Sequence, residues 1–486
     1  MASPLFARKS VELLHAELQA HDRLHRVLGP VSLTALGVGA IIGAGIFVLT
    51  GLAARDYAGP SLMLSFVLSG LGCALAGLCY AEFAAMIPVA GSAYTYAYAT
   101  LGELFAWIIG WDLVLEYAVA SCAVAHGWSH YFQSFLGLFG IRVPGPLSID
   151  PFSASPQVLA EAWHIGSVPI VFDLPAAAIV VALTVVLVIG IRESSRLNVL
   201  IVALKLGVEM FVILAGIPHV DPANWQPFFP QGWSGTLRGA GYVFFAYIGF
   251  DSISTHAEEA RHPERDVPLA LLGSLGVCTL LYIAVAGVLT GMVPTPQINI
   301  DAPLAEAFAR YGLGTATLII SLGAVAGITS VLLVMMLSQA RVLLAMARDG
   351  LLPPAIFAAI HPRFRTPYLS TVLTGAFVAT VAALFPLKVL SELVNIGTLF
   401  AFVIVCAAVL IMRRTRPEVR RPFRTPLVPA VPLLGIGANL LLMFSLGWAN
   451  WLRLLVWLMI GLVIYSAYGV RHSRLRNGTT RAGAQA

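Results

Sequence analysis

The sequence predicts an all-α integral membrane protein with twelve transmembrane helices, of which helices 1 and 6 are discontinuous. Three observations predict this fold. Of the 486 residues, 58% are hydrophobic and 11% are charged, whereas soluble domains carry about 25% charged residues. Apolar runs of about 20 residues, the length that crosses a bilayer, recur along the whole chain. Two of these runs, five spans apart, contain glycines that favour an interruption of the helix.

Charged residues, proline or glycine bound each apolar run. The expected spans are 32–53, 61–87, 103–135, 172–191, 197–217, 237–260, 267–292, 314–341, 368–386, 390–412, 427–446 and 450–470. Each repeat would contain five spans. Because an odd number of spans reverses the direction in which the next repeat enters the membrane, helices 1–5 (31–218) and helices 6–10 (219–413) would have opposite topology. Helices 11 and 12 would follow within 414–470.

Arginine and lysine are concentrated in alternate loops. This asymmetry predicts that the basic loops, and both termini, lie in the cytoplasm. Residues 1–30 are polar, with leucines spaced along one helical face, and predict an interfacial cytoplasmic helix. Residues 471–486 predict a cytoplasmic tail. The expected location is therefore the inner (cytoplasmic) membrane, and the net charge of +5 reflects loop arginines rather than a nucleic-acid surface.

Helix 1 contains Gly43, Ala44 and Gly45 within an apolar run. A break there would free backbone N–H and C=O groups, which persist at membrane depth only if protein buries them or a cavity receives them. N–H groups that begin a new half-helix favour a carboxylate, and freed carbonyls favour an ammonium. A break would therefore suit a zwitterion. The alternative is that these glycines are close-packing points of a continuous helix.

Helix 6 offers a second irregular stretch, where Gly249 stands beside the intramembrane acid Asp251. In the inverted-repeat arrangement, the two broken helices meet near the middle of the membrane. The helix is expected to end at Pro263. The charged residues around this proline, Glu258 and Glu259 among them, form either an inside gate or a solvated helix end.

Lys205 lies in the middle of helix 5, where a charge is costly and therefore a functional candidate. Its ammonium could stand in the place of a sodium ion and brace helix 5 against carbonyls of helix 1, or exchange a proton during transport. The alternative is a permanently paired structural lysine, with Glu209 one turn later as its partner.

Other ionisable residues fall inside spans. Asp112 and Glu116 share one face of helix 3 and could hold a cation or a substrate amine, or hydrogen-bond neighbouring helices. Asp251 either caps freed N–H groups or faces the cavity. Glu82 is expected to make a packing or gating hydrogen bond, and His126 to be a satisfied core histidine.

Several classes of protein are excluded. The five cysteines lie in apolar runs and indicate neither a disulfide framework nor a metal site. No P-loop is present, and the glycines of helix 1 do not fit a dinucleotide fingerprint. No cluster of histidine, cysteine or carboxylate residues indicates catalysis. We therefore expect no enzyme, no cofactor, no metal and no nucleic-acid partner.

With both irregular helices identified, the chain resembles the amino acid–polyamine–organocation superfamily, and more closely the bacterial relatives of the cationic amino acid transporters. The resemblance covers roughly residues 25–470. The stretches that carry it are 39–47 in helix 1, 245–251 running to 258–259 and 263–268 in helix 6, Arg341–Pro353, and Arg421–Pro426.

The resemblance implies a leucine-transporter-like fold of ten core helices plus two. It implies that backbone N–H groups around Gly43, Ala44 and Gly45, flanked by Ile46, bind a substrate carboxylate. Carbonyls near Ile42, Phe245, Ala246 and Ile248 would take the α-amine, and Phe245 would be an aromatic lid. Glu116 and Asp251 match acidic positions near the pocket. Lys205 matches the family lysine that replaces an ion, which favours a proton-linked role, while Glu209 departs from the family pattern.

Met335 stands where animal members of the family have a small residue. A bulky methionine would shrink the site, which argues for smaller or neutral amino acids and against arginine. The sequence is thus interpreted as a secondary active transporter that imports L-amino acids by alternating access, coupled to protons and independent of sodium. An obligate amino acid exchanger, or a cationic amino acid or polyamine transporter, is the alternative. The expected partners are the substrate, protons, membrane lipid and a small single-helix membrane protein.

Overall fold

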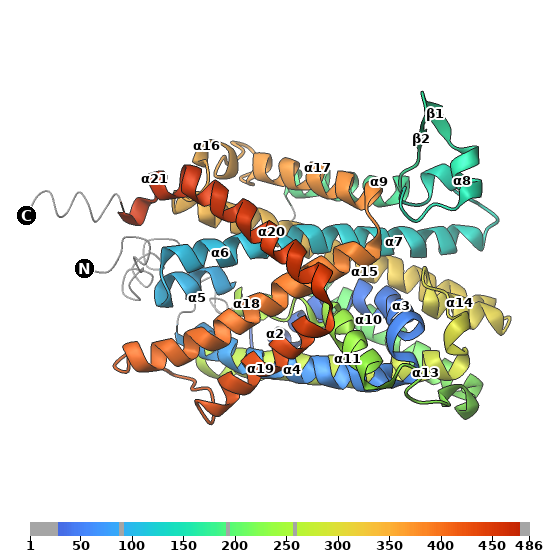
Figure 1. The fold of residues 1–486 in the computed structure, drawn as a ribbon, viewed down its shortest axis with the longest axis horizontal. Coiled ribbons are helices and arrows are strands. Elements are labelled where there is room, and N and C mark those ends of the chain that lie inside the picture. The colour runs from blue at the N-terminus through green and yellow to red at the C-terminus, as the bar shows by residue number, and fades with distance from the viewer. Residues whose placement is uncertain (1–27, 87–91, 191–194, 256–259, 477–486) are drawn as a thin grey trace, which may run out of the picture.

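The computed structural model describes residues 28–86, 92–190, 195–255 and 260–476. The expected interfacial helix of residues 1–30 therefore falls almost wholly outside the described residues, as do Glu258 and Glu259 and most of the expected C-terminal tail. Within the described part, the chain is a helical bundle (Figure 1).

The first half of the bundle follows the expected spans closely. Its helices are α2 (Pro30–Ile41), α3 (Thr50–Ala53), α4 (Leu62–Met86), α5 (Ser92–Thr100), α6 (Glu103–Val114), α7 (Ala120–Gly137), α8 (Pro156–Glu161), α9 (Leu174–Ile189) and α10 (Ser195–Gly216). The π-helical turns η2 (Gly45–Leu49) and η5 (Leu115–Val119) join α2 to α3 and α6 to α7. Such turns inside long helices are frequent at functional sites.

The second half continues in the same way. Its helices are α11 (Gly232–Val243), α12 (Ser252–Thr255), α13 (Pro263–Met292), α14 (Pro303–Arg310), α15 (Gly314–Arg348), α16 (Pro354–Phe357), α17 (Tyr368–Leu384), α18 (Leu387–Thr415), α19 (Ala430–Ser445), α20 (Trp448–Ile464) and α21 (Val470–His472). A short 3₁₀ turn, η9 (Phe244–Tyr247), follows α11.

Seven helical stretches of the described chain are long and apolar enough to cross a membrane, and four further apolar helices have 10–17 residues. The number of long stretches is smaller than the number of expected spans for two reasons. The stretch Gly45–Met86 contains both the end of expected helix 1 and helix 2, which meet at a turn at Gly59, whose φ is +59°. Several other spans, such as α9 and α17, are shorter than 18 residues.

The structure adds elements that the sequence did not predict. An antiparallel hairpin of β1 (Trp163–Ile165) and β2 (Val168–Ile170) lies with α8 at one end of the bundle (Figure 1). Pro263, expected to end helix 6, instead occupies the first turn of α13, where a missing N–H costs nothing.

The core elements pack in pairs that are distant in sequence. Helix α13 packs along α2 and α4, α15 packs on α7 and α10, and α17 packs on α9. The turns η2 and η9 also contact each other. This packing brings the two irregular stretches together at the centre.

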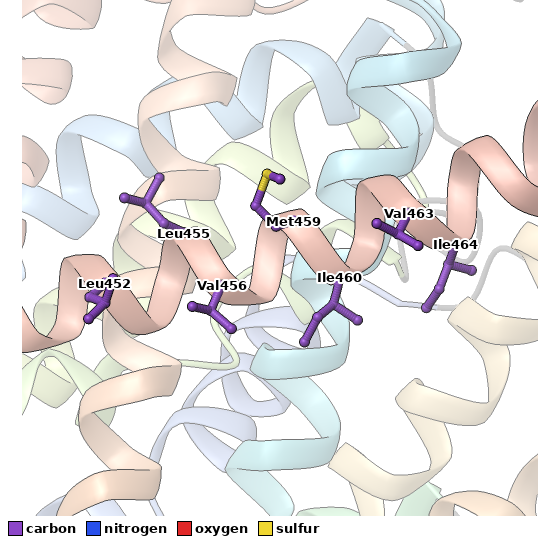
Figure 2. Close-up of a pocket in the computed structure, with 7 residues that line it drawn as sticks. All are labelled: Leu452, Leu455, Val456, Met459, Ile460, Val463 and Ile464. Atoms are coloured by element: carbon purple, nitrogen blue, oxygen red, sulfur yellow. The ribbon is translucent and has the colours of Figure 1, made fainter.

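Helix α20 presents an apolar surface outward (Figure 2). Its side chains line a shallow groove of about 530 Å³. The lining residues are Leu452, Leu455, Val456, Met459, Ile460, Val463 and Ile464. Met459 is 61% exposed, as expected for a surface that faces acyl chains rather than water.

Candidate functional site: two interrupted helices in contact

The helical hydrogen-bond pattern of helix 1 is interrupted beside Gly43. Helix α2 ends at Ile41, and Ile42 is extended with φ −71° and ψ 109°. Helical structure resumes at η2, where Phe47 N donates to Gly43 O at 3.4 Å. The first N–H groups of a resumed helix have no acceptor within that helix. The residues that begin this resumed helix are Gly43 to Ile46.

Helix 6 is interrupted in a different way. After η9, Ile248 is extended with φ −59° and ψ 137°, and Gly249 has φ +105°. A Cβ atom at Gly249 would also lie 2.8 Å from Ala40 O. Both the positive φ and the close approach require glycine.

The two interruptions touch each other directly. A Cβ atom at Gly45 would lie 2.3 Å from Ala246 Cα, so the backbones of η2 and η9 are in van der Waals contact. The two readings of the helix 1 glycines are thus not exclusive, because these glycines lie at an interruption and also permit close packing.

Tyr282, on α13, links both interruptions. Its hydroxyl lies 3.2 Å from Ile41 O and 3.0 Å from Ala246 O. A hydroxyl has one proton, so it donates to one carbonyl at a time and orients both. Sequence reasoning missed this residue because it lies in an otherwise unremarkable apolar run.

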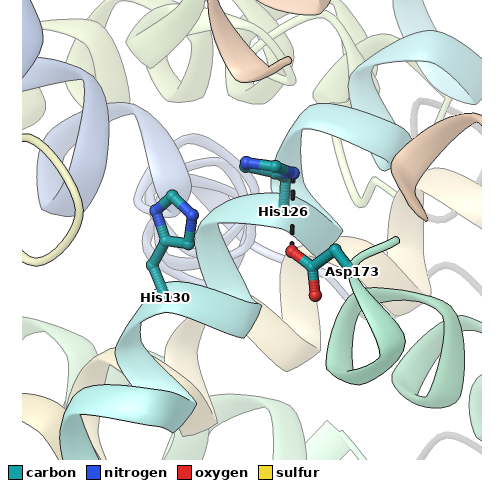
Figure 3. Close-up of side chains that lie close together, drawn as sticks. All are labelled: His126, His130 and Asp173. Carbon is teal, nitrogen blue, oxygen red and sulfur yellow. Dashed lines mark ion pairs between the residues drawn. The ribbon is translucent and has the colours of Figure 1, made fainter. Parts of the chain in front are cut away.

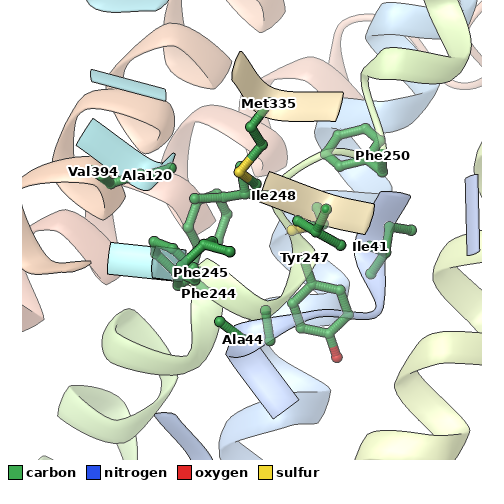
Figure 4. Close-up of a cluster of buried hydrophobic side chains, with 14 of the residues drawn as sticks. Ile41, Ala44, Ala120, Phe244, Phe245, Tyr247, Ile248, Phe250, Met335 and Val394 are labelled. Atoms are coloured by element: carbon green, nitrogen blue, oxygen red, sulfur yellow. The ribbon is translucent and has the colours of Figure 1, made fainter. Parts of the chain in front are cut away.

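Apolar side chains surround the paired interruptions (Figure 4). Phe245, Ile248 and Met335 are within one buried cluster, with Ala44 close by. Phe245 is 3% exposed and Met335 is 6% exposed. The structure therefore brings together the backbone of residues 42–46, the aromatic candidate lid and the candidate selectivity residue.

The acidic candidates lie beside this cluster. Asp251 accepts a hydrogen bond from the Tyr117 hydroxyl at 3.1 Å. Glu116, on η5, faces Asp251, and both carboxyls are buried. Asp112 points elsewhere, because its Oδ1 atom fills the space where Gly397 of α18 has no side chain. Glu116 and Asp251 thus form one pair, and Asp112 also interacts electrostatically with Glu116.

Lys205 braces two helices as the sequence suggested. Its Nζ atom donates to Gly39 O of α2 at 2.7 Å, and the residue is 1% exposed. Glu209 interacts with Lys205 electrostatically, but within the described chain the two form no ion pair and neither Glu209 oxygen has a hydrogen-bond partner. In this conformation the two residues are thus electrostatic neighbours without a direct salt bridge.

Glu82 makes a far larger set of contacts than one packing hydrogen bond. Arg413 donates to both carboxylate oxygens at 2.8 Å, and Thr425 N donates at 2.8 Å. Arg421 Nε lies 3.3 Å from Oε1. This cluster joins α4 to α18 and to the segment that follows it.

His126 is not a solitary core histidine. It lies 3.5 Å from an Asp173 oxygen and 3.9 Å from an Asp150 oxygen. Neither aspartate is near it in sequence, so no spacing pattern could have indicated the contact.

The chain is similar along almost its whole length to known transporters. The amino acid permease family matches residues 28–465. A methylthioribose transporter of Bacillus subtilis is 45% identical over 473 residues, covering 97% of this chain and 99% of the relative. The branched-chain amino acid permease BcaP of the same organism is 46% identical over 476 residues, covering 98% and 100%.

Plant relatives extend the similarity. The vacuolar cationic amino acid transporter 4 of Arabidopsis thaliana is 38% identical over 423 residues, covering 85% of this chain and 68% of the relative. Taken with the touching interruptions of α2–η2 and η9–α12, these matches show that the chain belongs to the amino acid permease family of the amino acid–polyamine–organocation superfamily.

Proposed function

We propose that this permease imports a neutral L-amino acid by alternating access, with a proton as the coupling ion and without sodium. The observation that carries the proposal is the contact between the two helix interruptions, in which buried helix-start N–H groups lie on the segment that faces the carbonyls of η9. This arrangement complements the carboxylate and the ammonium of one zwitterion.

The proposed binding roles follow from these backbone groups. The N–H groups of Gly43, Ala44 and Gly45 would bind the carboxylate, while Ile42 and Ile46 flank them. The carbonyls of Phe245, Ala246 and Ile248 lie on the facing segment and would accept from the α-amine. Ala246 O is also within reach of the Tyr282 hydroxyl. A carbonyl has two lone pairs, so this bond leaves one for the substrate.

The substrate side chain would lie among Phe245, Ile248 and Met335. Their apolar character favours an aliphatic substrate, in keeping with the permease for branched-chain amino acids among the relatives. Two acidic residues, Glu116 and Asp251, favour the alternative hypothesis that the substrate is cationic. Their carboxyls face each other and Asp251 binds Tyr117, so we assign them to local hydrogen bonding.

Lys205 is the proposed coupling residue. It is buried, and it donates to a carbonyl of α2 just before the interruption. Glu209 acts on it electrostatically, but no direct salt bridge joins the two in the described chain. Loss of its proton would remove the bond to Gly39 and free α2 to move. An exchanger would not require this step, and its uptake would depend on internal amino acid.

The membrane arrangement is part of the same proposal. Twelve spans, with both termini in the cytoplasm, would comprise inverted repeats at 31–218 and 219–413 and two further helices within 414–470. The even number of spans and the loop arginines support this topology. The exposed face of α20 would contact lipid or a small single-helix partner.

The test is uptake into proteoliposomes that contain the purified protein. Radiolabelled alanine, leucine, arginine and methylthioribose would be supplied separately, with an inward proton gradient and no sodium. We expect leucine or alanine to accumulate above equilibrium, and accumulation to collapse when an ionophore removes the gradient. Accumulation that occurs only with internal amino acid would establish exchange instead. Preferred uptake of arginine or methylthioribose would overturn the substrate assignment.

A further inference from the structure

Two histidines and two aspartates cluster between α7 and α9, and Figure 3 shows three of them, His126, His130 and Asp173. His126 and His130 are four residues apart on α7 and therefore share a face. Asp173 is the N-cap of α9, and Asp150 lies in the connection that precedes it. One ligand atom from each of His126, His130 and Asp173 can be chosen so that all lie within 4.8 Å of one another.

In each aspartate, one carboxylate oxygen accepts hydrogen bonds and the other has no hydrogen-bond donor among the described residues. Asp173 Oδ1 accepts from Ser129 Oγ at 2.6 Å and from Ala176 N at 3.0 Å. Asp150 Oδ1 accepts from the backbone N–H groups of Phe152 and Ser153. Among the described residues no donor reaches either Oδ2 atom, although both aspartates are fully buried.

Both of these Oδ2 atoms face the ring of His126. Asp173 Oδ2 is 3.5 Å from Nδ1, and Asp150 Oδ2 is 3.9 Å from Nε2. A neutral imidazole has one N–H, so it can satisfy only one of the two carboxylates and turns a lone pair toward the other. His126 Nδ1 also lies 3.4 Å from Ala382 O. A cation would balance the two carboxylates, and it can be a second proton on the ring or a metal ion that displaces the contact with Ala382.

The distances suit a metal ion better than a hydrogen bond. Hydrogen bonds of this type measure about 2.7–3.2 Å between heavy atoms, and both separations exceed that range. Two ligands of a tetrahedral Zn²⁺, with bonds of about 2.0–2.2 Å, lie about 3.3–3.5 Å apart. The separation between His126 Nδ1 and Asp173 Oδ2 matches this value.

We propose that His126, His130 and Asp173 bind one divalent transition-metal ion of the Zn²⁺ class. The donor set of two imidazoles and a carboxylate favours Zn²⁺ and its neighbours over Mg²⁺ or Ca²⁺. Metal binding at Nδ1 would leave the N–H on Nε2, which lies 3.9 Å from Asp150 Oδ2, and a small shift of either side chain would bring these atoms within hydrogen-bond distance. Asp150 fits this orienting role, which metal-bound histidines commonly require.

The cluster has an access route. A cavity of about 250 Å³ is lined by His130, Gln133, Asp301 and Glu306, among others. The side chain of His130 is 11% exposed, and its Nδ1 atom lies 3.4 Å from the exposed Asp301. An ion can therefore reach His130 from this cavity, and rotation of His130 would close the remaining distance to the other two ligands. Water or Asp301 would complete the coordination.

The experiment measures metal binding by purified protein without a polyhistidine tag. The protein is stripped with a chelator, and Zn²⁺ is titrated at neutral pH by calorimetry, with stoichiometry checked by elemental analysis after gel filtration. Co²⁺ serves as a second probe, because a tetrahedral site with histidine ligands gives intense visible absorption. We expect one ion per chain.

Three variants locate the ion. His130→Gln is partly exposed and should fold, and it should abolish stoichiometric binding. Asp150→Asn should weaken binding roughly 10- to 100-fold, as expected for an orienting partner. His164→Gln, on the exposed strand β1, is the matched control and should bind as the unmodified chain does. Binding that is absent in the unmodified chain, or that survives His130→Gln unchanged, would overturn the proposal.

Discussion

The buried charges at Glu82 and at Lys205 are satisfied to very different degrees. Glu82 receives bonds from Arg413 and Thr425, with Arg421 at 3.3 Å, so both of its oxygens are fully used. Lys205 has one hydrogen bond, to Gly39 O, and Glu209 one turn away has none among the described residues. Both regions place charge in a largely apolar helical bundle.

This difference indicates different uses of buried charge. A fully paired buried ion fixes the elements that it joins, because removing any partner leaves a buried charge uncompensated. A sparsely bonded ion can change protonation or partner at lower cost. We therefore regard the Glu82 cluster as a fixed joint between α4 and α18, and the region of Lys205 and the helix interruptions as the moving part.

The largest expected effect is on the fixed joint. Glu82→Ala leaves Arg413 and Arg421 without their shared carboxylate, and should destabilise the protein by about 3–5 kcal/mol. Thermal unfolding in detergent measures this loss. Glu161→Ala, on exposed α8, is the matched control. Equal shifts of the unfolding midpoint in the two variants would contradict the assigned role of the cluster.

A second large effect is expected where the two interruptions touch. Gly45→Ala places a Cβ atom 2.3 Å from the backbone of Ala246, so η2 and η9 must separate. Substrate binding, measured by scintillation proximity, should be lost. Gly276→Ala on α13 has no atom within 4 Å of the added methyl and should bind normally. Normal binding by Gly45→Ala would show that this contact does not shape the site.

A smaller effect is expected at Met335, which lies in the apolar cluster with Phe245. Met335→Ala enlarges the space beside the substrate by several methylene equivalents. The ratio of uptake efficiency for methionine over alanine should rise roughly tenfold, since one methylene in an apolar pocket is worth about 1–3 kcal/mol. An unchanged ratio would remove Met335 from the selectivity site.

The smallest effect on stability is expected at Glu209. Glu209→Gln preserves shape and removes no hydrogen bond within the described chain, so unfolding should change by less than about 1 kcal/mol. Glu82→Gln, which loses charged partners, should cost clearly more. If the two glutamine variants are equally destabilised, the contrast between the fixed and the moving region fails.

Much of the core could be predicted from the sequence because hydrophobicity and glycine act locally. The apolar runs located the helices, and Gly43–Gly45 and Gly249 marked both interruptions. The reach of Lys205 to helix 1 also followed, because a buried ammonium needs an oxygen partner. The sequence could not reveal Tyr282 or either arginine at Glu82, because these contacts join segments that only the fold brings together.

The same limit explains the remaining differences. The hairpin β1–β2 lies in a connection whose sequence has no strong alternation of hydrophobic and polar residues. Pro263 carries the same sequence signal whether it ends one helix or begins the next. His126 gains its carboxylates from Asp150 and Asp173, which are distant in sequence.

The central claim is that Lys205 couples transport to protons, and Lys205→Met tests it most directly. The variant keeps the length and apolar stem of the side chain but cannot carry a proton. In proteoliposomes, it should still exchange labelled for unlabelled substrate at equal concentrations, yet fail to accumulate substrate under a proton gradient. Gradient-driven accumulation at the unmodified level would contradict the account and leave Lys205 as a structural brace.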